Sequence, residues 1–201
     1  MKLGCVIMAA GASSRFGENK LLQDFLGKPL FTCVLNAAEG VFEKTVVVTG
    51  YEIIEKTAEK MGFLSVKNEH PELGVSHTIR LGSGALQDCD GVVFATADQP
   101  LLSRETLCRL AAEFGKEPSC IHAVCADGKR GNPCVFPKSL FGELVSLEGD
   151  TGGGAVIKAH SHLLRLLEVP SEELLDCDTP AALVKCREKA AKKLEKREKT
   201  I

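Results

Sequence analysis

The sequence lacks the features that would place it in a membrane or on nucleic acid. No apolar stretch approaches the roughly 20 residues of a membrane-spanning helix, and residues 1–10 do not have the order of a signal peptide. The 25 Lys and Arg nearly balance the 27 Asp and Glu, so there is no general attraction to nucleic acid or to membranes. We therefore expect a soluble protein that binds neither.

Paired cysteine motifs are also absent. The nine cysteines form no CxxC pair, and Cys5, Cys125 and Cys134 lie inside apolar runs, where a thiol behaves as a small hydrophobic side chain. We expect these cysteines to be reduced core residues of a cytoplasmic protein.

What is present suits one compact α/β domain over residues 1–201. Hydrophobic residues make up 44% of the chain, and no internal repeat or linker divides it. Continuous apolar runs recur at residues 3–10, 45–49, 92–97 and 120–126. Such runs are typical of strands covered on both faces, which predicts a largely parallel sheet.

Helix signals lie between these runs. Pro29 suits the first turn of a helix over residues 30–38, and Ser103 can cap a helix over residues 105–114 that ends at Gly115. The sequence therefore alternates strands and helices through its first two thirds.

The pattern changes after residue 126. Asp127-Gly128 predicts a turn, and Gly131-Asn132-Pro133 interrupts the approach to an apolar segment at 134–136, which predicts an antiparallel excursion. Beyond it we expect a helix over 137–147, a glycine-rich turn over 149–154, a strand over 162–169 and a basic, solvated helix over about 179–199.

The first strand runs directly into small, flexible and then cationic residues. This composition suits phosphate binding, because main-chain amides, hydroxyls and cations converge there. A Walker loop is excluded because Lys20 follows Gly17 by three positions, and the dinucleotide fingerprint is excluded by Ser13. The candidate nucleotide-binding residues are Ala9, Ala10, Gly11, Ala12, Ser13, Ser14, Arg15 and Lys20.

Two acidic sites are candidates for a metal. Asp98 follows an apolar strand, at the edge where open α/β sheets collect ligands, and a carboxylate there can hold Mg²⁺. The alternative, that Asp98 caps the next helix, is weaker because Ser103 is the better cap. Asp178, in the segment 176–180, can equally be an ordinary helix N-terminal signal.

Taken in order, several motifs resemble those of the MobA-like nucleotidyltransferases, with the molybdenum cofactor cytidylyltransferase branch as the most similar. The resemblance covers nearly the whole chain. The motifs are Ala9-Ala10-Gly11-Ala12-Ser13-Ser14-Arg15-Phe16-Gly17 with Lys20, Gly27-Lys28-Pro29-Leu30, Ala97-Asp98-Gln99-Pro100, Gly131-Asn132-Pro133, Gly149-Asp150 and Asp176-Cys177-Asp178-Thr179-Pro180.

This resemblance implies a three-layer Rossmann-like nucleotidyltransferase fold (a mostly parallel sheet with helices on both faces) in which the first loop binds an NTP. The match at Ala10 implies that this NTP is CTP. The resemblance also implies that Asp98 binds Mg²⁺, with Asp178 as a second metal or acceptor-side ligand. Arg15 and Lys20 would contact the triphosphate as catalytic residues. The segments that resemble the acceptor-facing part of the family contain Ser76, Asn132 and Asp150.

The implied reaction is attack by the terminal phosphate of an acceptor, molybdopterin in this branch, on the α-phosphorus of the NTP, with pyrophosphate leaving. A molybdoenzyme or its maturation chaperone would then be a partner. The branch usually has an arginine shortly after the residue matching Asp150, and this chain has Thr151-Gly152-Gly153-Gly154 instead. His77 has no assigned role.

Three alternatives stay open at this point. One is a GTP-dependent molybdopterin guanylyltransferase, and another is a sugar- or alcohol-phosphate nucleotidyltransferase, since fold and phosphate loop do not separate them. The third is a non-catalytic module that binds nucleotide or delivers cofactor. The joint presence of Arg15, Lys20 and Asp98 favours an enzyme.

Overall fold

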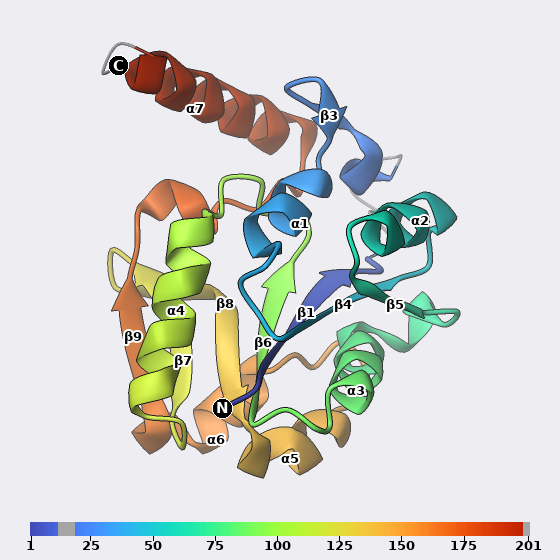
Figure 1. Cartoon of the computed structure of the whole chain (residues 1–201), viewed down its shortest axis with the longest axis vertical. Coiled ribbons are helices and arrows are strands. Elements are labelled where there is room, and N and C mark those ends of the chain that lie inside the picture. Colours follow the sequence, from blue (N-terminus) through green and yellow to red (C-terminus); the bar gives the residue numbers. More distant parts are fainter. Residues whose placement is uncertain (12–18, 199–201) are drawn as a thin grey trace.

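The computed structural model describes residues 1–11 and 19–198, and in these ranges a seven-stranded sheet has the order β5-β4-β1-β6-β8-β7-β9 (Figure 1). Strand β8 is antiparallel to both β6 and β7, and all other neighbours are parallel. The strands are β1 Leu3–Ala9, β4 Lys44–Thr49, β5 Leu64–Lys67, β6 Gly91–Thr96, β7 Ile121–Ala126, β8 Lys129–Pro137 and β9 Leu164–Glu168, with a separate hairpin of β2 Asp24–Phe25 and β3 Lys28–Pro29.

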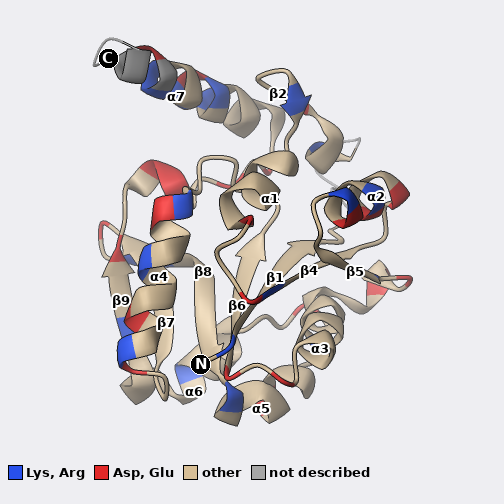
Figure 2. Ribbon diagram, in the orientation of Figure 1, with Lys and Arg blue, Asp and Glu red and all other residues tan. Residues whose placement is uncertain are grey.

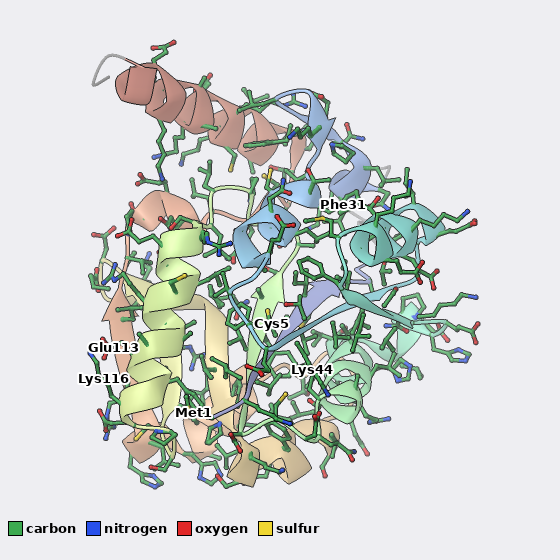
Figure 3. The ribbon with its side chains drawn as sticks, viewed as in Figure 1. Met1, Cys5, Phe31, Lys44, Glu113 and Lys116 are labelled. Atoms are coloured by element: carbon green, nitrogen blue, oxygen red, sulfur yellow. The ribbon has the colours of Figure 1, made fainter. Side chains whose placement is uncertain are left out.

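Helices cover both faces of this sheet, which makes three layers. Cys5 and Ile7 of β1 face one core with α1, α2 and α4, whereas Val6 faces a second core with α3, α5 and α6. Figure 3 shows Cys5 in the interior and the Glu113–Lys116 pair on the outside of α4. The helices are α1 Thr32–Ala38, α2 Glu52–Lys60, α3 Val75–Ala85, α4 Arg104–Lys116, α5 Phe141–Val145, α6 Gly154–Ala159 and α7 Pro180–Glu198.

The four predicted apolar runs are strands β1, β4, β6 and β7, each within two residues of the predicted bounds. The predicted cap of α4 is also confirmed, because the Ser103 side chain accepts a hydrogen bond of 3.1 Å from Thr106 N. The predicted end at Gly115 is wrong by one residue, since α4 continues to Lys116. A glycine that lacks a positive φ does not end a helix by itself.

The second part of the chain needs larger corrections. Gly131-Asn132-Pro133 does not interrupt β8, which runs through it and includes a cis Asn132–Pro133 bond. The register of the β7–β8 pairing shifts between Ala123 and Cys125 of β7. Gly131-Asn132-Pro133 therefore forms a bulge in β8 opposite Val124, and the strand continues on both sides of it. The antiparallel excursion itself is confirmed.

The predicted helix over 137–147 is a 3₁₀ turn, Lys138–Leu140, followed by the short α5. Helix α6 was missed, and it begins at Gly154 in the predicted glycine-rich turn because Val156 and Ile157 are buried against the second core. Helix α7 agrees with the predicted basic helix, whose last residue lies outside the described ranges, and its blue and red segments alternate in Figure 2.

Helix α7 buries Leu183 and Cys186 in the first core, and it also contacts the β2–β3 hairpin (Figure 1). Arg187 of α7 donates to the Asp24 backbone oxygen from Nε at 3.0 Å. Within the described ranges, none of the helices has the length and apolar character needed to cross a bilayer.

Candidate nucleotide and metal site

Lys20, Asp98 and Asp178 meet at one edge of the sheet, although they are far apart in the sequence. Lys20 Nζ lies 2.5 Å from Asp98 Oδ2 and 2.6 Å from Asp178 Oδ1. The side chains of Lys20 and Asp98 are 14% and 16% exposed, whereas that of Asp178 is 51% exposed. The cluster is therefore half-buried, with Asp178 on its open side.

Backbone hydrogen bonds hold the three segments in place. Asp98 lies just beyond β6, and Ala97 N donates to Met8 O of β1 at 3.1 Å. The segment before α7 runs alongside, because Cys177 N donates to Asp98 O at 2.9 Å. The 3₁₀ turn Lys20–Leu22 is capped by Asn19, whose side chain accepts from Leu21 N at 3.0 Å.

This location follows from the topology. Strand β1 is flanked by β4 on one side and by β6 on the other, so the chain order reverses direction across the sheet beside β1. Parallel strands place all their carboxyl ends at one edge, and a crevice forms where the order reverses. The site lies at that edge.

The charges in the cluster stabilise one another. Burial on its own would lower the pKa of Lys20, but the Asp98 charge and hydrogen bonds to Asp178 and Asp98 outweigh it, and the net pKa is raised. Lys20 therefore stays protonated. The pKa of Asp176 is raised to about 6, first by desolvation within the surrounding protein and then by the Asp98 charge.

The donor set at Asp98 fits a divalent cation. Its Oδ1 is buried and has no hydrogen-bond partner among the described residues. A buried carboxylate oxygen without a partner is destabilising unless a bound ligand or ion contacts it. Mg²⁺ is commonly held by one or two carboxylates together with substrate phosphates and water. Asp98 and Asp178 provide two carboxylates, and no cluster of three or more His, Cys, Asp or Glu side chains suited to a metal occurs in the described ranges.

A pocket of about 430 Å³ opens over this cluster. Ala10, Gly11, Lys20, Asp98 and Asp150 are among the residues that line it. Three residues of the predicted phosphate loop, Ala10, Gly11 and Lys20, therefore share one cavity with the predicted metal ligand Asp98.

Asp150 reaches this cavity from a distant turn because Gly74 allows a close approach. Gly74 has φ +83°, and a Cβ there would overlap the Gly149 backbone and the Asp150 side chain. Ser76 N donates to Gly149 O at 3.1 Å in the same junction. The side chain of Ser76 is itself buried and lines neither this pocket nor the larger one beside it.

The remaining predicted nucleotide-binding residues divide into two groups. Ala9 is buried in β1, where its carbonyl accepts from the Thr49 hydroxyl at 3.0 Å. Ala12, Ser13, Ser14 and Arg15 lie outside the described residues. Their roles stay predictions.

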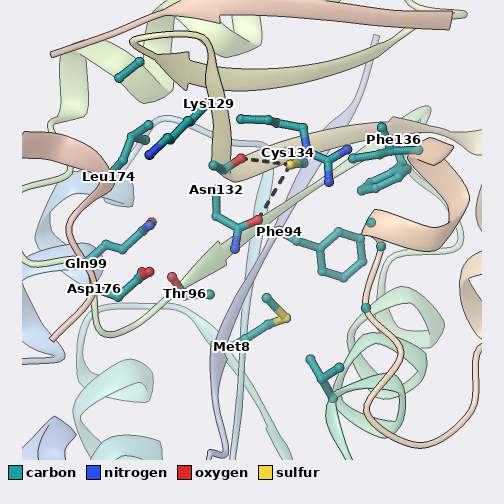
Figure 4. A pocket seen from close by; sticks show the side chains of 18 of the residues that line it. Met8, Phe94, Thr96, Gln99, Lys129, Asn132, Cys134, Phe136, Leu174 and Asp176 are labelled. Carbon is teal, nitrogen blue, oxygen red and sulfur yellow. Dashed lines mark hydrogen bonds between the residues drawn. The ribbon is translucent and has the colours of Figure 1, made fainter. Parts of the chain in front are cut away.

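A larger pocket of about 660 Å³ adjoins the first and contains the predicted acceptor residue Asn132 (Figure 4). The two pockets share Met8, Val75 and Thr96. Sequence reasoning missed Thr96 and Gln99, whose buried oxygens have no hydrogen-bond partner among the described residues. The sequence signal that could have identified them is their position on either side of Asp98.

Part of this sequence resembles a known protein family and several curated proteins. The sequence profile of the MobA-like NTP transferase domain matches residues 5–163. Bifunctional protein GlmU of Paracidovorax citrulli is 34% identical over 122 residues, which is 56% of this chain and 26% of GlmU. A relative from Aquifex aeolicus named "Probable molybdenum cofactor guanylyltransferase" is 33% identical over 116 residues, or 57% of this chain and 54% of that protein. The matches thus span about a quarter to a half of these curated relatives.

Solved structures share the fold. A nucleotidyl transferase from Methanothermobacter thermautotroptrophicus has a TM-score of 0.81 at 20% identity, over 96% of this chain and 99% of that one. Rv0371c from Mycobacterium tuberculosis in complex with manganese has a TM-score of 0.74 at 24% identity, over 94% and 99%. CMP:2-keto-3-deoxy-manno-octonic acid synthetase complexed with CTP has a TM-score of 0.74 at 16% identity, over 96% and 100%.

These likenesses confirm the predicted three-layer Rossmann-like nucleotidyltransferase fold. The profile match covers well over half of the sequence and includes Lys20, Asp98, Asn132 and Asp150. The chain belongs to the MobA-like NTP transferase family.

Proposed function

We propose that the protein transfers a nucleoside monophosphate from an NTP to a phosphorylated acceptor and releases pyrophosphate. The observation that carries the proposal is the contact of Lys20 Nζ with both Asp98 and Asp178 beside the 430 Å³ pocket. A cation next to two carboxylates, at the ligand-binding edge of a parallel sheet, suits a metal–triphosphate substrate.

The residues of the small pocket would bind and orient the triphosphate. Lys20 would donate to its phosphate oxygens, and the main-chain amides of the first loop would do the same. Arg15 is proposed as a second cation, because a guanidinium can bind phosphate through two parallel hydrogen bonds. Together they neutralise the charge of the leaving pyrophosphate.

Asp98 would hold a divalent cation, Mg²⁺ in our proposal, with Asp178 as a second ligand. Its unpartnered Oδ1 supports this assignment. When bound, such an ion neutralises charge on the phosphoryl groups of the substrate. Asp98 and Asp178 would then fix its position relative to Lys20, which they contact directly.

The transfer needs no covalent enzyme intermediate. An oxygen of the acceptor's terminal phosphate forms a bond to the α-phosphorus while the bond from that phosphorus to the bridging oxygen breaks, and the electron pair leaves with pyrophosphate. An ionised phosphate is already a nucleophile near neutral pH, so no general base is needed. The pocket's contribution is positioning and charge neutralisation.

For the specific substrates we propose CTP and molybdopterin, with product passing to a molybdoenzyme or its maturation chaperone in the cytoplasm. Ala10 supports CTP by its resemblance to the cytidylyltransferase branch. The Aquifex relative's name favours the guanylyltransferase alternative, and the other curated relative described is named GlmU. A thermal-shift panel of CTP, GTP, ATP and UTP with Mg²⁺ tests which base the protein binds. A rise in Tm with GTP alone would show that GTP, not CTP, is the nucleotide substrate.

Pyrophosphate release tests the proposal as a whole. Purified protein with Mg²⁺, CTP and molybdopterin should release pyrophosphate in proportion to acceptor. Omitting the acceptor and, separately, the Asp98→Asn variant provide the controls. If no phosphorylated acceptor supports release with any NTP, the protein is a non-catalytic binding or cofactor-delivery module.

A further inference from the structure

The 660 Å³ pocket beside the small one contains a polar group that the proposed chemistry does not use. Gln99 lines this pocket and is only 2% exposed. Its Oε1 is buried without a hydrogen-bond partner among the described residues. Figure 4 shows the Gln99 side chain pointing into the pocket, with Asp176 beside it and Phe94 and Phe136 on the other side. A buried acceptor of this kind is costly until a ligand supplies a donor.

The Gln99 amide oxygen Oε1 is buried and has no hydrogen-bond partner among the described residues. An amide oxygen can only accept a hydrogen bond. The oxygen is therefore the atom left for a ligand, and that ligand must present an N–H or O–H group.

The opposite wall of the pocket is apolar and suits a flat ring. Met8, Ile79, Phe94 and Phe136 line it, and the two phenyl rings lie 5.9 Å apart at 73°. Aromatic walls favour flat ligands through stacked or edge-to-face contacts. Recognition pockets commonly combine such a wall with a few polar groups that set orientation.

Charge does not decide what this pocket binds. Lys129 and Arg130 line it, but so do Asp127 and Asp176. The two signs are equal in number, so a ligand gains little from a net charge on its ring. Hydrogen bonding and shape remain as the means of selection.

The larger pocket also opens toward the proposed reaction site. Thr96 lines both pockets, and its buried Oγ1 has no partner among the described residues. A compound whose ring occupies the larger pocket can extend a phosphate past Thr96 toward Asp98, which lies two residues further along the chain. The hydroxyl of Thr96 can donate to that phosphate.

We propose that the 660 Å³ pocket binds the body of the acceptor, a flat ring compound, and that Gln99 selects it by accepting a hydrogen bond from an N–H or O–H donor on the ring. This inference rests on the proposed function, because it assigns the acceptor side of that reaction. Gln99 is then a specificity-determining residue.

Two probes that are not substrates test the inference. 2-Naphthol and naphthalene share a flat apolar ring system and differ in one O–H donor. Their Kd values are measured by fluorescence titration with saturating CTP and Mg²⁺, for the wild type and for Gln99→Met. Gln87→Met is the matched control, since Gln87 is exposed. The Kd ratio of naphthalene to 2-naphthol should fall about tenfold in Gln99→Met, the effect of one net hydrogen bond, and stay unchanged in Gln87→Met.

The inference is overturned if the ratio is unchanged in Gln99→Met, or if neither probe binds the wild type. If Gln99→Met fails to fold, Gln99→Asn is measured instead, because its shorter side chain moves the amide oxygen away from the ligand. The same fall in the Kd ratio is expected. These outcomes do not depend on which acceptor is used. Absent pyrophosphate release would instead refute the proposed function, and the two failures are therefore distinguishable.

Discussion

Lys20 Nζ lies 2.5 Å from Asp98 Oδ2, although 78 residues separate the two in the sequence. The pair joins the turn after the first loop to the end of β6, and Asp178 completes the contact from a third segment. This arrangement brings a cation and two carboxylates to the edge where a parallel sheet binds ligands.

Asp98→Asn should remove most of the turnover, by at least about 100-fold, because loss of one electrostatic contact to a transition state commonly costs that much. The fold should remain, since an amide has the size of the carboxylate. Steady-state pyrophosphate release and thermal unfolding measure the two effects. Asp88→Asn is the control, because Asp88 is exposed and forms only surface ion pairs, with Lys44 and Lys2. Wild-type turnover in Asp98→Asn would contradict the assignment.

Glu173 is expected to position the segment that carries Asp178. It is only 3% exposed, and its Oε2 accepts from Ser103 N and Ser103 Oγ, each at 3.1 Å. Glu173→Ala should lower the free energy of unfolding by about 1–3 kcal/mol, because it leaves two half-buried donors of Ser103 without this acceptor, and should raise the KM for NTP. Denaturant unfolding and NTP titration check both effects.

Glu173→Gln keeps an acceptor oxygen in the same place and should lose much less stability than Glu173→Ala. Glu59→Ala, on the exposed face of α2, should change neither stability nor KM. Equal losses in Glu173→Ala and Glu59→Ala would show that the contact with Ser103 has no positioning role.

Gly74→Ala should destabilise the protein by at least about 1–3 kcal/mol, since only glycine readily adopts its backbone conformation. Gly74 has φ +83°, and a Cβ would overlap the Gly149 backbone. Gly84→Ala should have the opposite sign and stabilise by about 0.5–1 kcal/mol, because Gly84 is in α3 with nothing within 4 Å of an added Cβ. Thermal unfolding of both variants compares them; stabilisation by Gly74→Ala would refute the close approach.

Cysteine reactivity should follow exposure. All nine cysteines are free, and Cys108 alone is exposed. Burial raises the pKa of the Cys134 thiol to about 12, so at pH 8 almost none of it is the reactive thiolate. Labelling with iodoacetamide, read by peptide mass spectrometry, should modify Cys108 first, and Cys108→Ser should remove the fast phase. Early modification of Cys134 would contradict its burial.

The strands near the site could be predicted because their apolar runs reflect burial on both faces, as for β1 and β6. Asp98 could be found for the same reason, since a carboxylate directly after a buried strand stands out. The contact of Lys20 with Asp178 could not be derived from spacing, because it depends on how the segment before α7 returns to the sheet. The resemblance to known nucleotidyltransferases placed both residues at the substrate site but did not predict their contact.

Other features depend on tertiary contacts that one sequence does not display. Two glycines precede helix α6 and a third begins it, and the helix forms because Val156 and Ile157 are buried in the second core. Gln99 lies in the motif around Asp98, but its importance comes from a buried oxygen without a partner among the described residues, which only the structure shows. Patterns that predict elements are local, whereas these two features are not.

Binding of Mn²⁺, as a paramagnetic stand-in for Mg²⁺, tests the central claim most directly. Electron paramagnetic resonance titrations with and without CTP should show that the wild type binds Mn²⁺ more tightly when CTP is present. Asp98→Asn should weaken this CTP-dependent binding at least about tenfold, the lower end of losses seen for altered metal sites, and Asp88→Asn should not. Unchanged Mn²⁺ binding in Asp98→Asn would contradict a carboxylate-held ion beside Lys20.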